Sequence, residues 1–196
     1  MKSGATQLLV MCIAAFVLAT APGDRIVLAN PGGEKAKNKV KDPSFEGGTP
    51  NDAWNQSSTF WPQVICDGAC TDSGTDNLAR TGEWWASFGG NVGGENASLL
   101  TQKVKFPGGG SGTLTFWLYI SHFSGNGEDQ LSVYVDDERV FKVKDGDTQY
   151  DDGYTRVDID VSAYCDGNKH RLRFRSTSGG SPSYVQFLVD DVSVKQ

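Results

Sequence analysis

The sequence has few histidines and lacks the common catalytic motifs. It contains two histidines, His122 and His170, and neither belongs to a catalytic motif. It has no G-x-S-x-G elbow, no H-E-x-x-H pair and no phosphate-binding loop. We therefore predict that the protein is not an enzyme. The enzymatic alternative is a small glycan-active hydrolase, which would need two carboxylates held across a cleft.

Long hydrophobic runs are also missing, with one exception at the N-terminus. Leu8 to Ala21 is apolar, comes after Lys2, and is followed by small-residue cleavage sites at residues 19–21 and 27–29. This pattern predicts a signal peptide over residues 1–29, because the apolar run is too short to span a bilayer comfortably. An uncleaved anchor is the alternative. We expect a secreted, extracellular or periplasmic protein with no membrane span.

Positive charge is in deficit, with 18 lysines and arginines against 24 aspartates and glutamates. This acidic balance argues against nucleic acid as a partner. Residues 30–42 (NPGGEKAKNKVKD) differ, because they are rich in glycine and lysine and have little to bury. We predict a flexible lead-in over 30–42, followed by one domain over 43–196.

Cysteines are few, and three follow the predicted signal peptide: Cys66, Cys70 and Cys165. One disulfide is expected in an oxidising compartment, and the short spacing favours the pair Cys66 and Cys70. A zinc site is the alternative, but it would need further ligands. Cys165 is then a buried thiol or a link to another chain.

Helical spacing is nearly absent. From Pro43 onward, apolar residues alternate with polar ones, as over residues 114–121, 131–135, 157–161 and 171–175. Such alternation predicts half-buried strands, and glycine- and aspartate-rich turns separate them. Many short strands at regular intervals predict an all-β fold, a two-sheet antiparallel β-sandwich.

Two rows of charge follow neighbouring predicted strands. Arg171, Arg173 and Arg175 alternate with core positions, as do Asp158 and Asp160 on the strand before. A hairpin would place the two rows side by side as cross-strand ion pairs, which is the interpretation we favour. An anion-binding site on the arginines is the alternative.

Four aromatic residues are out of phase with the predicted core. They are Trp85, Trp117, Tyr119 and Tyr134, and residues of opposite parity in a strand face opposite ways. Exposed flat rings on a sheet commonly mark a binding surface, and sugar rings stack on them. We predict these four as ligand-binding residues. The alternative is that a loop, such as the long one over residues 54–86, covers them.

The stretch QFLVDDVSV near the C-terminus has two aspartates, Asp190 and Asp191, inside a predicted strand. The apolar parity changes across them, which predicts a bulge that frees backbone carbonyls. Carbonyls and a carboxylate form an oxygen-rich pocket that suits calcium. Glu46, in PSFEGG at the expected first strand, is the candidate partner. The alternative is two aspartates that cap exposed backbone groups.

Four short motifs occur in this order along the predicted domain, the first and last near its two ends: D-P-S-F-E-G-G, T-G-E-W-W-A-S-F-G-G, G-T-L-T-F-W and F-L-V-D-D-V-S-V. Over about residues 42–195 the chain resembles the galactose-binding-like jelly-roll domains, which include carbohydrate-binding modules of families 4, 9, 16 and 22. The resemblance implies a structural calcium joining the first and last strands. Its ligands would be Glu46 and Asp190 with the carbonyls of Ser44 and Gly82, and Asp191 would replace Asp190 if the register were shifted.

The resemblance also places the sugar site either on the concave face of a sheet or in the loops at one end. We therefore predict a secreted, non-catalytic carbohydrate-binding domain with a structural calcium ion and a polysaccharide or glycan as partner. The alternative is an extracellular protein-interaction or cell-surface structural domain of the same fold, with a secreted protein as partner.

Overall fold

Strands make up nearly all of the regular structure in the computed structural model. It describes residues 36–71, 74, 76–90, 97–121, 127–178 and 185–196, all of them in the unit Glu34–Gln196. The predicted signal peptide, residues 30–35 of the predicted lead-in and His122 lie outside the described residues. In the part that is described, no helix has the length and apolarity needed to cross a membrane.

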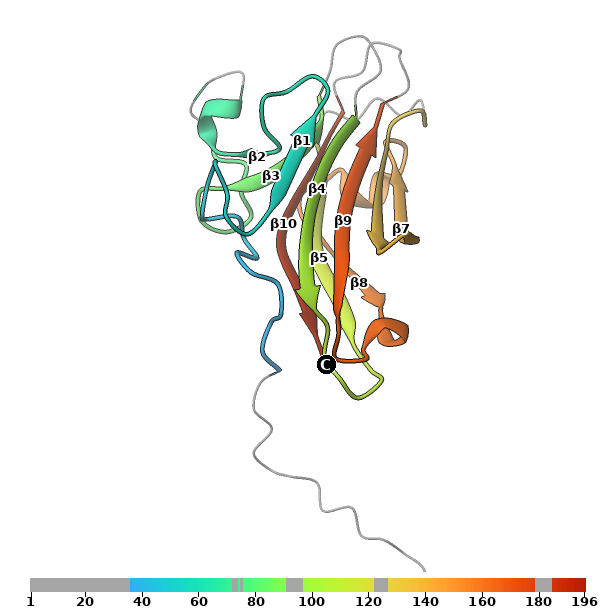
Figure 1. The fold of residues 1–196 in the computed structure, drawn as a ribbon. Helices are drawn as coiled ribbons and strands as arrows, with labels where there is room; N and C mark the ends of the chain where they lie inside the picture. Colours follow the sequence, from blue (N-terminus) through green and yellow to red (C-terminus); the bar gives the residue numbers. More distant parts are fainter. Residues whose placement is uncertain (1–35, 72–73, 75, 91–96, 122–126, 179–184) are drawn as a thin grey trace, which may run out of the picture. The chain divides into compact units, whose positions relative to one another are not determined.

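Two five-stranded antiparallel sheets face each other, which confirms the predicted β-sandwich (Figure 1). Sheet A has the order β1 (Asn55–Ser58), β4 (Ala97–Lys105), β9 (Lys169–Thr177), β6 (Gln130–Val135) and β7 (Glu138–Lys144). Sheet B has the order β2 (Ile65–Cys66), β3 (Trp85–Gly89), β10 (Gln186–Lys195), β5 (Thr113–Ser121) and β8 (Thr155–Asp160). Single turns of 3₁₀ helix occur at Gly68–Cys70, Thr148–Tyr150 and Ser162–Tyr164.

The core lies between the sheets and follows from the alternation within each strand. In β5, Leu114, Phe116, Leu118 and Ile120 are buried, while the residues between them are more exposed. Phe174 of β9 meets this row from the other sheet, its ring centroid 5.3 Å from that of Phe116. A fully buried side chain of this kind contributes about 1.5–3 kcal/mol. Packing between alternate residues therefore holds the two sheets together.

The chain changes sheet between β8 and β9, so the predicted hairpin of charged rows is wrong. β8 is the edge strand of sheet B, paired with β5, whereas β9 lies at the centre of sheet A. Asp158 instead pairs with Arg156, at 2.9 Å, and accepts from Thr115, so the arginines of β9 have different neighbours. The 3₁₀ turn at Ser162–Tyr164 and the loop after it carry the chain across the sandwich.

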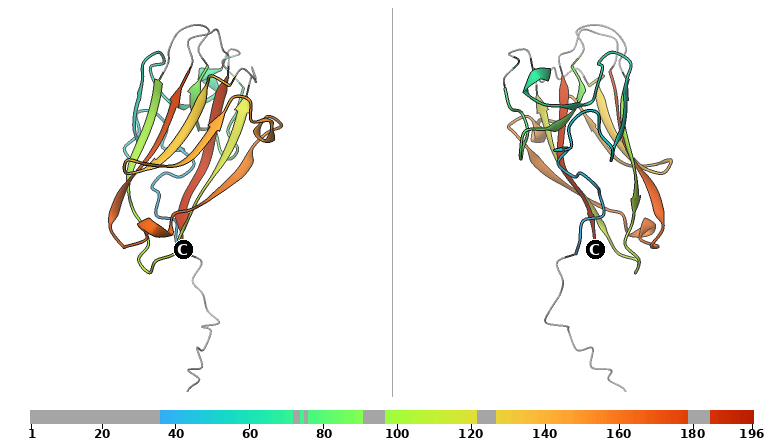
Figure 2. Two further views of the ribbon diagram at one scale, coloured as in Figure 1. Left: turned by 90° about the vertical axis from the view of Figure 1, so that its right-hand side faces the viewer. Right: turned by 60° about the vertical axis from the view of Figure 1, so that its left-hand side comes forward.

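The beginning of the described chain lies along β10, unlike the flexible lead-in that its composition predicts (Figure 2). The Asn38 side chain donates to the Val192 carbonyl at 2.9 Å and accepts from the Val194 amide at 3.1 Å. Lys39 donates its amide to the Val194 carbonyl, and Val40 is buried. Residues 38–40 are held by hydrogen bonds to backbone groups of β10. Amino-acid composition cannot predict this contact, because it does not show which strand lies beside the segment.

Residues 43–48 form a turn and not the first strand that we expected. Phe45 is buried but has φ of +61°, in the left-handed region, and Gly48 has φ of +68°. The two ends of the described chain still meet, because the Val192 amide donates to the Pro43 carbonyl at 2.8 Å. This turn places Glu46 opposite the segment that leads into β3.

The predicted disulfide between Cys66 and Cys70 is present, so these two cysteines are not zinc ligands. Cys165 is a free and buried thiol, which is the first of the two alternatives that we predicted for it. Its burial raises the pKa of the thiol above the ordinary value.

Candidate functional site

The bulge predicted in β10 is present. Its pairing register with β5 shifts between Asp190 and Ser193, and Asp191 has φ of +50°. Asp190 is fully buried, and its carboxylate accepts backbone N–H bonds from Arg80 at 2.8 Å and Thr81 at 3.0 Å. Desolvation raises the pKa of Asp190 to about 7. The carboxylate fastens the segment before β3 to the last strand.

Glu46 binds the other end of the same segment. Its carboxylate accepts backbone N–H bonds from Glu83 at 3.1 Å and Trp84 at 3.0 Å. A Cβ atom on Gly82 would lie 2.2 Å from Oε1 of Glu46, and Gly82 has φ of +72°. Only glycine therefore permits this approach. Glu46 and Asp190 thus converge on residues 80–84.

The chemistry of these groups fits a calcium site in type, because carboxylates and carbonyls are the oxygen ligands that calcium takes. The described residues contain no group of three histidine, cysteine, aspartate or glutamate side chains placed to hold a metal. Further ligands would have to come from carbonyl oxygens or water, and the carbonyl of Gly82 already accepts from the Asn77 side-chain amide at 2.9 Å. The calcium ion stays a prediction. The alternative of two capping aspartates fits Asp190, which accepts from backbone amides, whereas Asp191 bonds the side chains of Arg80 and Thr81.

Trp85 is buried, with 1 % of its surface exposed, so the expected exposure of this ring is wrong. It faces away from the main core, as parity predicted, and forms a small second cluster with Cys66 and Leu188 on the outer face of sheet B. Leu78 and Ala79 pack on this cluster. Residues of the long loop over 54–86 therefore cover the ring, which was our stated alternative.

Trp117 and Tyr119 also lie on the outer face of sheet B and are half-buried. The guanidinium carbon of Arg80 lies 3.6 Å from the centroid of the Trp117 ring, and the same arginine pairs with Asp191. Tyr119 packs against Tyr154 with ring centroids 5.8 Å apart. A groove of about 660 Å³ runs beside Trp117. One face of the Trp117 indole is therefore already occupied by a cation.

Tyr134 lies on the opposite side of the sandwich, on the outer face of sheet A. The guanidinium carbon of Arg173 is 4.5 Å from the centroid of its ring. The structure therefore separates the four predicted ligand-binding aromatics into three on sheet B and one on sheet A. They cannot form a single site.

The most exposed large hydrophobic side chains among the described residues are Phe60 and Trp61, which sequence reasoning missed. Their exposed fractions are 54 % and 40 %, and their rings meet edge to face at 4.8 Å. The Trp61 indole N–H donates to the Gly89 carbonyl at 2.8 Å, which holds the ring in place. They follow β1 in the run S-S-T-F-W-P, where strand parity has no meaning. The available sequence signal for an exposed pair was two adjacent aromatic residues directly before a proline.

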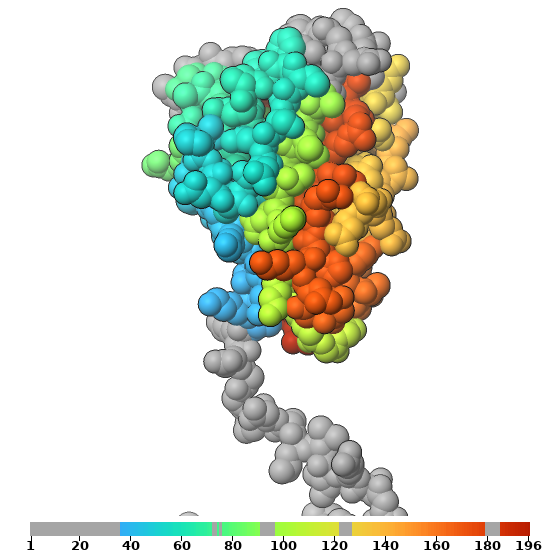
Figure 3. Space-filling view, in the orientation of Figure 1, coloured from blue at the N-terminus to red at the C-terminus, as the bar shows by residue number. Residues whose placement is uncertain are grey.

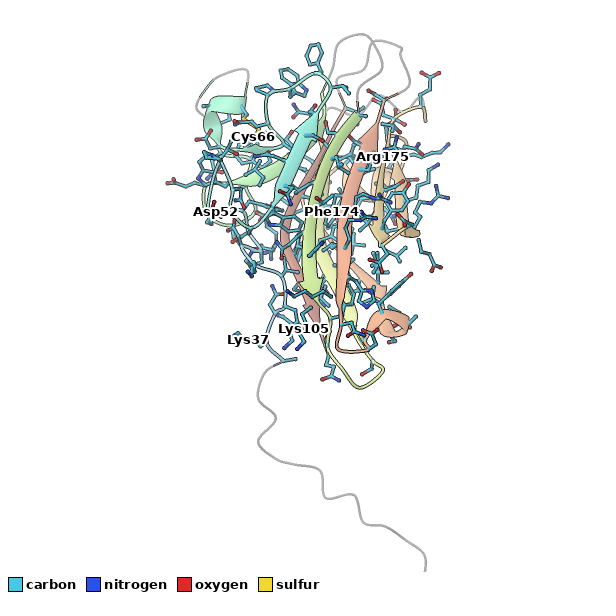
Figure 4. The ribbon with its side chains drawn as sticks, viewed as in Figure 1. Lys37, Asp52, Cys66, Lys105, Phe174 and Arg175 are labelled. Carbon is cyan, nitrogen blue, oxygen red and sulfur yellow. A yellow bond between two sulfur atoms is a disulfide. The ribbon has the colours of Figure 1, made fainter. Side chains whose placement is uncertain are left out.

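A groove of about 380 Å³ lies on sheet A, where β1 ends. It is lined by Ser57, Ser58 and Thr59, which directly precede Phe60, by the start of β4, and by Arg173 and Arg175 of β9. Figure 3 shows this face of the molecule, where β1, β4 and β9 run side by side. Figure 4 labels Arg175 on β9 of this face. Exposed rings, hydroxyl groups and cationic side chains thus share one end of sheet A.

His170 has a structural position at the start of β9. Its ring nitrogens lie 2.8 Å from a carboxylate oxygen of Asp136 and 3.0 Å from one of Asp166. The hydrogen bond to Asp136 is the main cause that raises the pKa of His170, and bonds to the Arg171 amide and to His170 lower that of Asp136. These contacts tie the β6–β7 turn to the loop before β9.

No protein-family model matches the sequence, and no curated protein matches it. Solved structures do. The carbohydrate-binding module TmCBM61, solved with β-1,4-galactotriose, is 18 % identical, with a TM-score of 0.52 over 82 % of this chain and 100 % of that one. The chain has the fold of a carbohydrate-binding module.

Two further solved structures are similar to the chain. The K3 adhesin domain of Lys-gingipain from Porphyromonas gingivalis W83 is 14 % identical, with a TM-score of 0.53 over 81 % of this chain and 96 % of that one. A cyclase from Fischerella sp. TAU is 11 % identical over 79 % of this chain and 94 % of that one, with a TM-score of 0.47, too low to carry an argument. The resemblance seen in the sequence is confirmed for the fold.

Proposed function

We propose that the protein is a secreted, non-catalytic carbohydrate-binding domain whose partner is a polysaccharide or glycan. The observation that carries the proposal is the exposed pair Phe60 and Trp61, which directly follows the groove-lining residues Ser57 to Thr59 on a fold shared with a carbohydrate-binding module. Secretion is supported by the signal-peptide pattern of residues 1–29. Fold likeness alone does not assign a ligand, so the proposal rests on this site.

The two rings have the properties of a stacking platform. A sugar presents a flat C–H face that packs on an aromatic ring, while its hydroxyls exchange hydrogen bonds with groups around it. The Trp61 ring is held by its bond to Gly89, so little side-chain freedom is lost on binding. Ser57 and Thr59 supply hydroxyl groups in the adjoining groove.

The test is a glycan-binding screen on the purified protein, followed by affinity measurement for any ligand found. We expect Trp61→Ala to weaken binding by about tenfold or more, since an aromatic anchor commonly contributes at least 1.4 kcal/mol. Trp117→Ala, on the opposite sheet, is the matched control and should leave binding within about twofold.

Other outcomes of this screen are equally informative. Loss of binding in Trp117→Ala alone would move the site to the groove of about 660 Å³ on sheet B, which is the second candidate. Absence of glycan binding together with a specific secreted protein partner would establish the protein-interaction alternative. Turnover of a glycan would show that the protein is an enzyme.

We also propose a structural calcium held by Glu46 and Asp190, with the carbonyls of Ser44 and Gly82. A bound cation would neutralise the buried Asp190 carboxylate, which supports the proposal. Calcium at a thousandfold excess over its dissociation constant should stabilise the fold by about 4 kcal/mol. Melting with and without a chelator tests this. An unchanged melting temperature after complete metal removal would contradict it, and Glu46→Gln should diminish the calcium-dependent shift.

A further inference from the structure

Charge is distributed very unequally between the two sheets. The strands of sheet A contain nine lysines and arginines and one acidic residue, Glu138. The strands of sheet B contain two basic and four acidic residues. The chain as a whole has a net charge of −6. A basic sheet in an acidic protein is a local feature that the net charge conceals.

All nine basic side chains alternate with buried core positions, so they share the outer surface of sheet A. Strand pairing arranges several of them in rows across the sheet: Arg175, Ser132 and Lys142 occupy one row, and Arg173, Tyr134 and Arg139 the next. Adjacent strands are about 4.8 Å apart, so the outer cations of each row are separated by about 10 Å. We call this surface the basic face; it comprises Lys103, Lys105, Arg139, Lys142, Lys144, Lys169, Arg171, Arg173 and Arg175.

Counter-charges on the basic face are scarce. The carboxylate of Asp137 lies 3.1 Å from Arg171 and 3.7 Å from Arg173, but Asp137 is 84 % exposed. Within the described ranges, Arg175 and the lysines of the basic face have no ion pair, and the Arg175 side chain is exposed. The basic face therefore has donors to offer.

Like charges also stand opposite each other across strands. Lys103 pairs in register with Arg171, and Lys105 with Lys169. Such pairs destabilise a sheet, and an anion bound over them would relieve the repulsion. The basic face adjoins the groove, because Arg173 and Arg175 belong to both. Phe60 and Trp61 directly follow Ser57, Ser58 and Thr59, which also line the groove.

We infer that the ligand of the basic face is an anionic polysaccharide that carries carboxylate or sulfate groups. The inference rests on the proposed carbohydrate-binding function and specifies its ligand class. Arginine guanidinium groups bind carboxylates and sulfates through two parallel hydrogen bonds, which a neutral sugar cannot offer. Phe60 and Trp61 would stack on sugar rings at one end while the arginines and lysines bind the acidic groups along the strands. A glycan is favoured over nucleic acid by the proposed carbohydrate-binding function, and duplex DNA is therefore included in the test.

The experiment compares chemically matched glycans on the purified protein. Polygalacturonate is set against its methyl-esterified form, and dextran sulfate against dextran, at low and at physiological salt. We expect each acidic member to bind at least about tenfold more tightly than its neutral counterpart, with affinity that falls as salt rises. The preferred acidic member identifies carboxylate or sulfate as the recognised group.

Charge reversal locates the site. Arg175→Glu and Lys142→Glu should each weaken acidic-glycan binding about tenfold or more, whereas Lys195→Glu, the same change on sheet B, should leave it within about twofold. Equal affinity for the neutral counterparts, or no effect of Arg175→Glu, would overturn the inference while leaving the proposed function standing. Duplex DNA bound as tightly as the acidic glycans would also overturn it. Failure to bind any glycan would reject both.

Discussion

Gly82 is the position where one added methyl group should reveal how the turn containing Glu46 is held. Gly82→Ala places a Cβ atom 2.2 Å from Oε1 of Glu46 in a residue with φ of +72°. Gly110→Ala is a matched control, because Gly110 has φ of +73° and nothing lies within 4 Å of the added atom. The two substitutions therefore share the backbone strain and differ in the steric conflict.

The expected costs follow from these contacts. A left-handed alanine costs roughly 1–2 kcal/mol, which is the full expectation for Gly110→Ala. In Gly82→Ala the carboxylate must also leave the amides of Glu83 and Trp84. Hydrogen bonds to a charged group contribute about 1.5–3 kcal/mol each when buried, and the exposure of Glu46 reduces this to a smaller gain. We expect Gly82→Ala to cost about 3 kcal/mol in free energy of unfolding.

The assay is denaturant unfolding in a chelator-containing buffer, so that any bound metal does not enter the comparison. A double-mutant cycle with Glu46→Ala completes it, because removal of the carboxylate removes the conflict. In that background Gly82→Ala should cost no more than Gly110→Ala does. The reasoning is refuted if Gly82→Ala and Gly110→Ala cost the same in the wild-type background, or if Glu46→Ala leaves the cost of Gly82→Ala unchanged.

Two further predictions concern the packing of loops. The pKa of His170 is raised chiefly by its bond to Asp136, so its stabilising contribution is complete below its unfolded pKa of about 6.5 and is lost as pH rises through the folded value. The melting temperatures of wild type and His170→Gln should therefore converge from pH 6 to about pH 9, and parallel curves would contradict this. Replacing both Cys66 and Cys70 by serine should cost only about 2 kcal/mol in a denaturant titration, because the closed loop is short. A loss above about 4 kcal/mol would show that the bridge does more than close this loop.

Several features could be read from local pattern. The alternation over residues 114–121 predicted β5, and the change of parity at Asp190 and Asp191 predicted the bulge in β10. The short spacing of Cys66 and Cys70 predicted their disulfide. Each of these depends on geometry within a few residues, where strand period and chain reach determine the result.

The positions of the aromatic candidates could be predicted only in part. Parity correctly placed Trp85 and Trp117 away from the main core. It could not show that Leu78 and Ala79 cover Trp85, because those contacts come from a loop with no periodic pattern. The exposure of Phe60 and Trp61 could not be predicted for the same reason, because they lie outside any strand and have no periodic pattern.

The sequence by itself determined the strands with clear alternation and the two-layer fold class, because alternation must bury one side of each strand. Only the tertiary structure decided which strands share a sheet. Consecutive strands β8 and β9 separate, while β4, β9, β6 and β7 come together and concentrate basic side chains on one surface. The physical reason is that pairing between distant strands is selected by the packing of the whole core. Parity within one strand carries no information about its neighbours.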